Sequence, residues 1–328
     1  MGKLGRSESR ERRRNLARRT LFGVLFLALL AGGCATGKEK ASPPQGEEPR
    51  YAAVDARGVK VAFAHPPKTV VALTPSDVEV LFALGLDEEI LAVGEFCNYP
   101  DAANQKKRLG SGQNTSVEQI IALKPELLFL TRDSKVQEYA DQAEKAGIKV
   151  FVTSAQNLAQ TYDTILATGT LVGKKSEAED LVENMKNRIQ ALETAVAARQ
   201  QNQEPVRVYF EVSPLVYGLW TCGQGSFQNE ALELIGAQNI FRDITSWQQV
   251  SEEEVIVRNP QVIVTSASDY GVGDPVAEIK ARPNWQTIEA IRNGRVYLME
   301  DDTLARPAPR LVEGIERLYQ AIYEEGNG

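Results

Sequence analysis

The chain has 328 residues with a formal net charge of −7, and 43% of its residues are hydrophobic and 25% are charged. This length suits about two domains, and the composition is that of a globular protein with a full core. Residues 1–33 carry eight basic and two acidic side chains, so their removal would change the net charge to −13. Such an acidic protein is not expected to bind nucleic acid, or anionic lipid through a basic face.

Residues 1–33 have the order of segments found in an export signal. Basic side chains precede a short apolar run from Leu21 to Ala31, and small residues lead to Cys34. This order resembles a bacterial lipoprotein signal peptide, which implies that Cys34 becomes a lipid-modified N-terminus. The apolar run is too short to span a bilayer as a helix. Arg18 and Arg19 also resemble part of a twin-arginine signal, so the export route stays open.

A tether is predicted after the signal. Residues 34–50 combine proline and glycine with charged side chains, a composition typical of flexible linkers. The protein is therefore expected to be exported and held to the bacterial cell membrane by a lipid anchor, facing the periplasm or the outside.

Strands and helices alternate from Thr69 onward. The expected strands cover 69–73, 90–93, 127–131 and 149–152, and the expected helices begin near Pro75, Ser116 and Val136. Such alternation predicts a parallel sheet, and ligands of parallel sheets bind at the carboxyl ends of the strands. The loops that follow Leu73, Val93 and Leu130 are therefore expected to share one rim.

The longest predicted helix is Ser176–Gln201. Its apolar residues recur at helical spacing on one side, and the opposite side is charged. Ser176 has Glu179 three residues on, which is the spacing of a capping box, and Pro205 ends the segment. The apolar side consists of Ala178, Leu181, Val182, Met185, Ile189, Leu192 and Val196. Either this helix bridges two lobes, or it lies on the surface of one large domain.

The alternation restarts beyond the long helix. Strands are expected at 207–212, 261–265 and 295–299, and helices at 227–235 and 311–325. The loop 213–225 is rich in aromatic residues and glycine, and the loop 301–309 precedes the last helix. The second half therefore also predicts a rim of loops, and two rims that face each other would form a cleft.

A short repeat favours the two-lobe alternative. Ser116–Pro125 aligns without gaps with Ser251–Pro260, and an apolar run follows each copy. Each copy predicts a serine-capped helix, a proline turn and a buried parallel strand. The predicted fold is α/β, with two Rossmann-like lobes, parallel central sheets, one long joining helix and a ligand cleft between the lobes. The expected domains are an N-terminal lobe 51–172, a bridging helix 173–205 and a C-terminal lobe 206–328.

Few residues offer catalytic or metal-binding chemistry. His65 is the only histidine, and no spacing of histidine, cysteine and carboxylate residues is typical of a zinc site. Hydrolysis through a serine or cysteine nucleophile would require His65 to reach the rim. Cys97 and Cys222 fall in loops of different lobes. We expect both to be thiols that line the site or lie beneath it, with a disulfide as the alternative.

Four aromatic residues point to a flat ligand. Phe96, Tyr99, Trp220 and Trp247 all fall in predicted rim loops, where burial in a core is not expected. Flat side chains on two walls suit a large flat ligand, because ring stacking buries area at little cost in entropy. The alternative is that Tyr99 and Trp220 pack against loop backbone, so that only the other two are exposed.

Six motifs together resemble a known family, the vitamin B12 and iron-siderophore binding proteins of ABC importers. The motifs are Phe96–Pro100, Ser116–Pro125, Gly223–Phe227, Asn239–Phe241, Trp247–Glu253 and Arg306–Gly314. Their order and spacing cover essentially all of Tyr51 to Tyr323. The resemblance implies a monomeric solute-binding protein that delivers its ligand to a transporter in the inner membrane and catalyses no reaction.

The resemblance also assigns a role to the repeat. It implies that Glu118 and Glu253, one on each lobe, meet arginines of the two subunits of an ABC permease dimer. Exposed charge pairs of this kind steer docking, and two equivalent acids suit a symmetric dimer. Without the resemblance, the preferred explanation of both residues is that they are solvated acids at helix N-termini.

The resemblance favours a corrinoid as ligand, bound by Phe96, Tyr99, Trp220 and Trp247. Asp302 and Arg306 are expected at the floor or edge of the site, and Arg310 is expected to be structural. Two aromatic positions of the enteric B12 binders correspond here to Gly112 and Thr131.

A ferric siderophore or haem is the alternative ligand. Arg132, Arg306 or both would then meet ligand carboxylates or the negative charge of the chelate. No cofactor or resident metal is expected beyond the cobalt or iron of the ligand. A different class stays open, namely a lipid-anchored interaction protein without a small ligand, whereas an exported enzyme would need a metal or nucleophile that the sequence does not show.

Overall fold

The structure is a computed structural model that describes residues 50–110, 114–133, 135–199, 204–266, 273–299 and 302–324. The described residues all belong to one compact unit. The predicted signal 1–33, the lipidation site Cys34, Gly112 and Gln201 lie outside the described residues. Among the helices that the structure describes, none is both long enough and apolar enough to span a bilayer.

Five parallel strands form the sheet of the first lobe, in the order β5-β4-β3-β6-β7. They are β3 (Val70–Ala72), β4 (Ile90–Gly94), β5 (Lys107–Leu109), β6 (Leu127–Thr131) and β7 (Lys149–Thr153). The parallel pairing confirms the prediction for this lobe. The sequence pattern predicts neither β5 nor the antiparallel hairpin of β1 (Tyr51–Val54) and β2 (Lys60–Phe63), because both are short.

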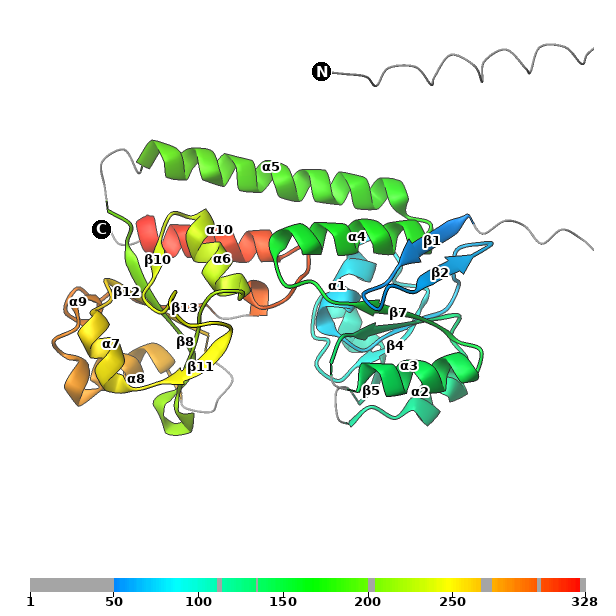
Figure 1. Cartoon of the computed structure of the whole chain (residues 1–328), viewed down its shortest axis with the longest axis horizontal. Helices are drawn as coiled ribbons and strands as arrows, with labels where there is room; N and C mark the ends of the chain where they lie inside the picture. The colour runs from blue at the N-terminus through cyan, green and yellow to red at the C-terminus, as the bar shows by residue number, and fades with distance from the viewer. Residues whose placement is uncertain are drawn as a thin grey trace, which may run out of the picture. The chain divides into compact units, whose positions relative to one another are not determined.

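Helices cover both sides of this sheet, which is why its central strands β3, β4 and β6 are mostly apolar (Figure 1). The helices α1 (Pro75–Ala83) and α4 (Leu158–Val172) pack on one side, and α2 (Val117–Leu123) and α3 (Val136–Lys145) pack on the other. Gly85 and Gly147 follow α1 and α3 with φ of 74° and 85°. Glycine suits this left-handed conformation, which explains why the two helices end here.

The sheet of the second lobe has the order β11-β9-β8-β12-β13, and β10 also pairs with β8. Its strands are β8 (Arg207–Ser213), β9 (Leu219–Cys222), β10 (Gln238–Asn239), β11 (Trp247–Val250), β12 (Val262–Thr265) and β13 (Val296–Leu298). Its helices are α6 (Phe227–Leu234), α7 (Glu252–Arg258), α8 (Pro275–Ala281), α9 (Glu289–Arg292) and α10 (Leu311–Tyr323). The short α8 and α9 are not predicted from the sequence.

The sequence predicts rim loops where β9 and β11 lie, but both form strands, and β9 pairs antiparallel with β8 and with β11, so this edge of the second sheet is mixed. Only a short turn, with the 3₁₀ segment η3 (Leu215–Tyr217), joins β8 to β9. A parallel connection needs a crossover of a dozen or more residues, so this turn permits only a hairpin. The central strands β8, β12 and β13 are parallel, as predicted.

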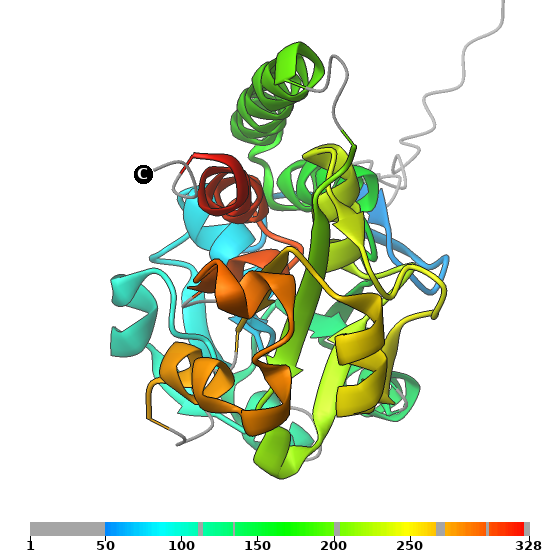
Figure 2. The ribbon, with the colours of Figure 1, turned by 90° about the vertical axis from the view of Figure 1, so that its left-hand side faces the viewer.

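The long helix α5 (Lys175–Arg199) connects the two lobes along the chain. It packs against α4 and α10, and the view along its axis shows these three helices as neighbours (Figure 2). Its predicted apolar face is confirmed, because all of its members are buried except the half-buried Leu181. The domain boundaries 51–172, 173–205 and 206–328 stay predictions, with α5 inside the middle segment.

The predicted N-cap at Ser176 is wrong. The helix begins one residue earlier, and the backbone N–H of Ala178 already donates to the carbonyl of Lys174 at 3.0 Å. The preceding helix α4 ends at Gly173, whose φ is 75°, so the chain reverses within two residues. This tight helix–helix junction sets the start of α5, and a capping box at Ser176 is not needed.

The internal repeat is confirmed as a repeated structural unit. Ser116 caps α2 by accepting from the backbone N–H of Gln119, and Ser251 caps α7 in a capping box with Glu254. Both helices end in a left-handed residue just before the proline, Lys124 with φ 50° and Asn259 with φ 44°. The strands β6 and β12 follow at the same offset, and each lies inside its sheet.

Polar contacts and a shared core join the lobes in the described part of the chain. Arg310, before α10, binds Glu79 of α1, and Arg306 donates to Asn98 at 2.8 Å. Glu230 of α6 accepts from the first backbone N–H of α4 at 2.8 Å. One continuous hydrophobic cluster contains residues of both sheets together with α5 and α10. The two α/β lobes joined by a long helix confirm the predicted fold class.

Candidate ligand-binding site

The predicted aromatic residues lie on loops and strands at the carboxyl edges of the two sheets. Phe96 and Tyr99 belong to the loop after β4, and their exposed fractions are 65% and 41%. The same loop contains Asn98, whose side chain accepts a hydrogen bond from Arg306. Because Arg306 follows β13 in the second lobe, this bond brings one rim loop of each lobe together.

Tyr99 lies against a structural cluster. The Arg310 guanidinium is 3.5 Å from the centroid of the Tyr99 ring, an arrangement that favours a cation–π interaction. The same guanidinium donates to Glu79 through Nε at 3.1 Å and Nη2 at 3.0 Å. Arg310 therefore has the structural role expected of it, and it holds Tyr99 in place.

Trp220 and Trp247 lie on strands and not in loops. In the antiparallel pair of β9 and β11, Trp247 is opposite Cys222 and Trp220 is opposite Gln249. Opposite residues share a face, and alternate residues of one strand share a face. The two tryptophans therefore occupy the same face as diagonal neighbours, about 7–8 Å apart. Their exposed fractions of 41% and 40% leave a broad apolar surface at this sheet edge.

The structure gives two of the predicted polar residues hydrogen-bond partners within the protein. The Arg132 side chain donates to the backbone carbonyl of Ala56, beside the end of β1, and does not line the cavity next to Phe96. Arg306 is engaged with Asn98. The backbone of Asp302 starts the 3₁₀ segment η6 (Asp302–Leu304), and its side chain is outside the described part of the structure.

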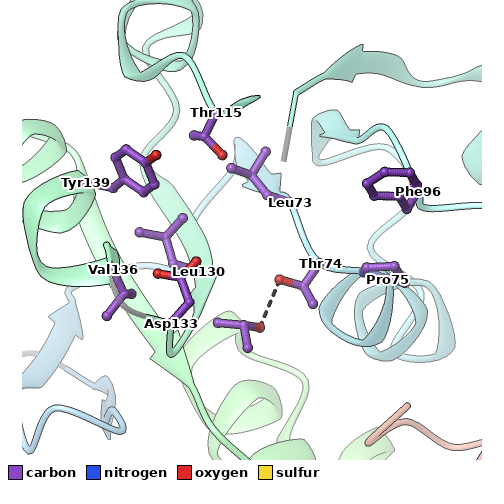
Figure 3. Close-up of a pocket in the computed structure, with 10 residues that line it drawn as sticks. Leu73, Thr74, Pro75, Phe96, Thr115, Leu130, Asp133, Val136 and Tyr139 are labelled. Carbon is purple, nitrogen blue, oxygen red and sulfur yellow. Dashed lines mark hydrogen bonds between the residues drawn. The ribbon is translucent and has the colours of Figure 1, made fainter. Parts of the chain in front are cut away.

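A cavity of about 290 Å³ opens at the carboxyl edge of the first sheet. Its walls come from the ends of β3 and β6, the start of α3 and the loop that contains Phe96 (Figure 3). The lining residues are Leu73, Thr74, Pro75, Phe96, Thr115, Leu130, Thr131, Asp133, Val136 and Tyr139. Phe96 is the only predicted ligand-binding residue among them.

A buried carboxylate lies beneath this cavity. Asp77 of α1 is 5% exposed and accepts from Thr153 at 2.9 Å, and Thr131 Oγ1 lies 3.4 Å from Asp77 Oδ2. The Thr131 hydroxyl donates its one proton to the nearer Thr74 oxygen at 2.8 Å, the bond drawn as a dashed line in Figure 3. Burial raises the pKa of Asp77 to about 7, although hydrogen bonds from the three threonines lower it. Asp77 therefore ionises near neutral pH.

This raised pKa predicts that the protein loses stability as the pH rises from about 4 to about 7. The folded protein keeps the Asp77 proton longer than the unfolded chain, so folding is favoured at lower pH. We expect Asp77→Asn to remove this contribution. We would measure the free energy of unfolding in urea at pH 5 and at pH 8. The decrease from pH 5 to pH 8 should be about 2–3 kcal/mol larger in the wild type than in the variant. Equal decreases would contradict a raised pKa of Asp77.

The two cysteines are free thiols. Cys97 and Cys222 are fully buried, one in each lobe. Burial raises the pKa of each thiol to about 12. Both thiols therefore stay protonated, and they pack beneath the rim as the sequence led us to expect. No cluster of metal-ligating side chains occurs within the described ranges.

Glu118 and Glu253 are exposed in the first turns of α2 and α7. The Glu118 carboxylate accepts from the Ser116 hydroxyl at 3.1 Å. At α7, the neighbouring glutamates have internal partners, since Glu252 binds Trp285 Nε1 and Glu254 completes the capping box. Glu253 makes no hydrogen bond or ion pair with any residue that the structure describes.

Sequence reasoning does not find the polar cluster under the cavity. Thr74, Thr131 and Thr153 follow or end β3, β6 and β7, which are neighbours in the sheet. Polar residues at the carboxyl ends of adjacent parallel strands are the available signal. The partner Asp77 could be placed only by the packing of α1.

Comparisons with known proteins agree with this architecture. The profile of the periplasmic binding protein family matches residues 70–303. The chain is 32% identical over 309 residues to an uncharacterised ABC transporter substrate-binding lipoprotein, YvrC, of Bacillus subtilis, covering 92% of this chain and 96% of the relative.

Two solved structures are also similar. A possible iron-binding periplasmic solute-binding protein of Staphylococcus epidermidis has a TM-score of 0.69 and 30% identity, covering 79% of this chain and 100% of its own. The periplasmic vitamin B12 binding protein of Vibrio cholerae has a TM-score of 0.67 and 26% identity, covering 80% and 100%. These similarities extend over both lobes.

Proposed function

We propose that this chain, which belongs to the periplasmic binding protein family and is the solute-binding protein of an ABC importer, captures a corrinoid between its lobes. Members of this family are binding proteins and not enzymes, and the proposed function includes no catalysis. The ligand would rest on Phe96 and Tyr99 on one side and on Trp220 and Trp247 on the other.

The choice of ligand depends mainly on the hydrogen bonds that the arginine side chains around the rim already make. Arg132 donates to Ala56, Arg306 to Asn98 and Arg310 to Glu79. Arg108 donates to the backbone carbonyls of Gly94 and Cys97. Haem carboxylates or an anionic ferric chelate would have to share these guanidinium groups with the protein acceptors that they already bind.

The corrin ring of a corrinoid needs no such cation, because the arms attached directly to the ring are neutral amides. Its flat ring suits the exposed faces of the rim aromatics. A ferric siderophore or haem remains the second candidate. That alternative is supported by the similarity to the Staphylococcus epidermidis protein, which is described as possibly iron-binding.

The carboxylates of Glu118 and Glu253 would dock on the permease dimer. They occupy equivalent positions in the repeat, at N-termini of helices that precede β6 and β12. An equivalent acid on each lobe matches two equivalent permease subunits. The lipid anchor at Cys34 would keep a monomeric protein close to that partner at the cell membrane, as the lipoprotein relative suggests.

Calorimetric titration of the chain from Ala35 onward tests the proposal, because it retains the whole compact unit. The ligands are cyanocobalamin, a ferric hydroxamate or catecholate, and haemin. We expect one-to-one submicromolar binding of cyanocobalamin. Binding of an iron ligand alone would move the function to the second candidate, and binding of none would favour an interaction lipoprotein without a small ligand.

We expect Trp220→Ala and Trp247→Ala each to raise the Kd for cyanocobalamin about 10- to 100-fold, because a half-exposed tryptophan provides a large stacking area. Gln248→Ala is the matched control. Gln248 is also exposed on β11, but strand alternation places it on the opposite face from Trp247. Titration of all three variants checks this prediction, and a loss in the control equal to that in Trp247→Ala would contradict it.

A further inference from the structure

The cavity at the edge of the first sheet is too small for a corrin ring, but it suits one of its side arms. Its volume of about 290 Å³ corresponds to roughly ten water molecules at about 30 Å³ each. Phe96 lines the cavity and is 65% exposed, so the cavity adjoins the proposed ligand surface. Most of its wall is apolar, and the polar groups therefore decide what it accepts.

The hydroxyl protons of the strand-end threonines are all used within the buried cluster. The Thr153 hydroxyl donates to Asp77, and the Thr131 hydroxyl donates to Thr74. The Thr74 hydroxyl in turn hydrogen-bonds Asp77. Each hydroxyl has a single proton, so Thr74 and Thr131 have only lone pairs left for the cavity.

Asp133 adds a third acceptor at the mouth of the cavity. Its Oδ1 accepts from the backbone N–H of Lys135 at 2.8 Å, which fixes the carboxylate at the start of α3. Oδ2 has no hydrogen-bond partner among the described residues. Together, Thr74, Thr131 and Asp133 form a wall, here called the acceptor wall, that offers acceptors and negative charge.

We propose that this cavity is a subsite for a primary amide arm of the ligand and selects it against a carboxylate arm. The amide N–H groups would donate to the acceptor wall, and the Thr115 hydroxyl could donate to the amide oxygen. A carboxylate has no proton to donate and would be repelled by Asp133. Asp77 acts as a positioning residue, because it holds the threonine protons away from the cavity. This inference rests on the proposed function.

The test compares two corrinoids by calorimetric titration at pH 8. Cobinamide has amide arms, whereas cobyrinic acid has carboxylates in the same places. We expect the wild type to bind cobinamide at least tenfold more tightly. Asp133→Asn removes the charge but keeps the oxygen that accepts from the Lys135 backbone N–H, and it should reduce this preference about fivefold or more.

Asp77→Asn should reduce the preference similarly, because its amide N–H groups donate to the threonines and return hydroxyl protons to the cavity. The matched control is Asp141→Asn, the same change at an exposed position of α3 that faces away from Tyr139. The control should keep the wild-type preference. If Asp77→Asn does not fold, Asp133→Asn alone decides.

The outcomes separate the two proposals. An unchanged preference in the Asp133→Asn variant, with tight cobinamide binding, would overturn the subsite and leave the proposed function standing. Equal binding of cobinamide and cobyrinic acid by the wild type would also overturn the subsite and leave the proposed function standing. If the wild type binds neither corrinoid, the proposed function fails and the subsite fails with it.

Discussion

Replacement of both Glu118 and Glu253 by alanine is expected to reduce cobalamin uptake about 100-fold or more and to leave binding within twofold. Each carboxylate is exposed in the first turn of its helix, so its removal costs the fold little. At a docking interface, the loss of one partner of a charge pair costs about 2–5 kcal/mol. Two lost pairs would therefore prevent productive contact with the permease. The measurement is uptake of labelled cobalamin by cells that depend on this chain, alongside titration of the purified variant.

The matched control replaces Glu88 and Glu204, which changes the charge by the same amount. Both are exposed, and they precede β4 and β8 at the amino ends of the two sheets. Glu118 and Glu253, in contrast, lie at the starts of α2 and α7, near the carboxyl ends of the sheet strands. The control pair therefore lies at the opposite ends of the two sheets. The control should transport normally. Normal uptake by the Glu118 and Glu253 double variant would refute the docking assignment, and equal loss in both double variants would indicate a general effect of charge.

Arg282→Met is expected to lower the free energy of unfolding by about 3–5 kcal/mol. The Arg282 guanidinium is buried and donates to both oxygens of the buried Glu211 at 2.8 Å. It also donates to Glu278 and stacks on Trp285, with 4.3 Å from the guanidinium carbon to the ring centroid. Methionine would fill much of the space but leave the Glu211 carboxylate buried without a counter-ion. Urea unfolding followed by circular dichroism checks the loss.

The comparison variant is Arg317→Met, which makes the same substitution in a surface pair. Arg317 binds Glu313 one turn away on α10, and both side chains are partly exposed. Such i,i+4 pairs contribute about 0.3–0.5 kcal/mol. A further Glu211→Leu change in the Arg282→Met background should recover part of the stability, because it removes the unpaired charge. Equal effects of the two arginine variants would contradict the burial argument.

The sequence alone determines the α/β alternation, the long helix and the repeat. These features depend on local patterns, namely apolar periodicity, serine caps, and glycine or proline ends, which act within a few residues of each other. The two copies of the repeat, Ser116–Pro125 and Ser251–Pro260, have the same local structure. Each includes a left-handed residue just before its proline. The family resemblance rests on the same segments and is confirmed by the match over residues 70–303.

Local patterns fail where a neighbouring element decides the outcome. The start of α5 depends on how tightly α4 turns into it, and the direction of β9 depends on a turn too short for a crossover. Trp220 and Trp247 are therefore strand residues on one face of a hairpin, a placement that follows from pairing register and not from composition.

Only the tertiary structure decides which polar groups remain available for a ligand. The sequence offers Arg132 and Arg306 as candidates, but the fold engages them with Ala56 and Asn98, and a hydrogen bond to a partner already in place removes a donor from the site. Conversely, Asp77 reaches Thr131 and Thr153 across more than fifty positions of the chain. The packing of α1 on the sheet makes that contact, because burial and hydrogen-bond partners depend on distance in space and not on spacing in the sequence.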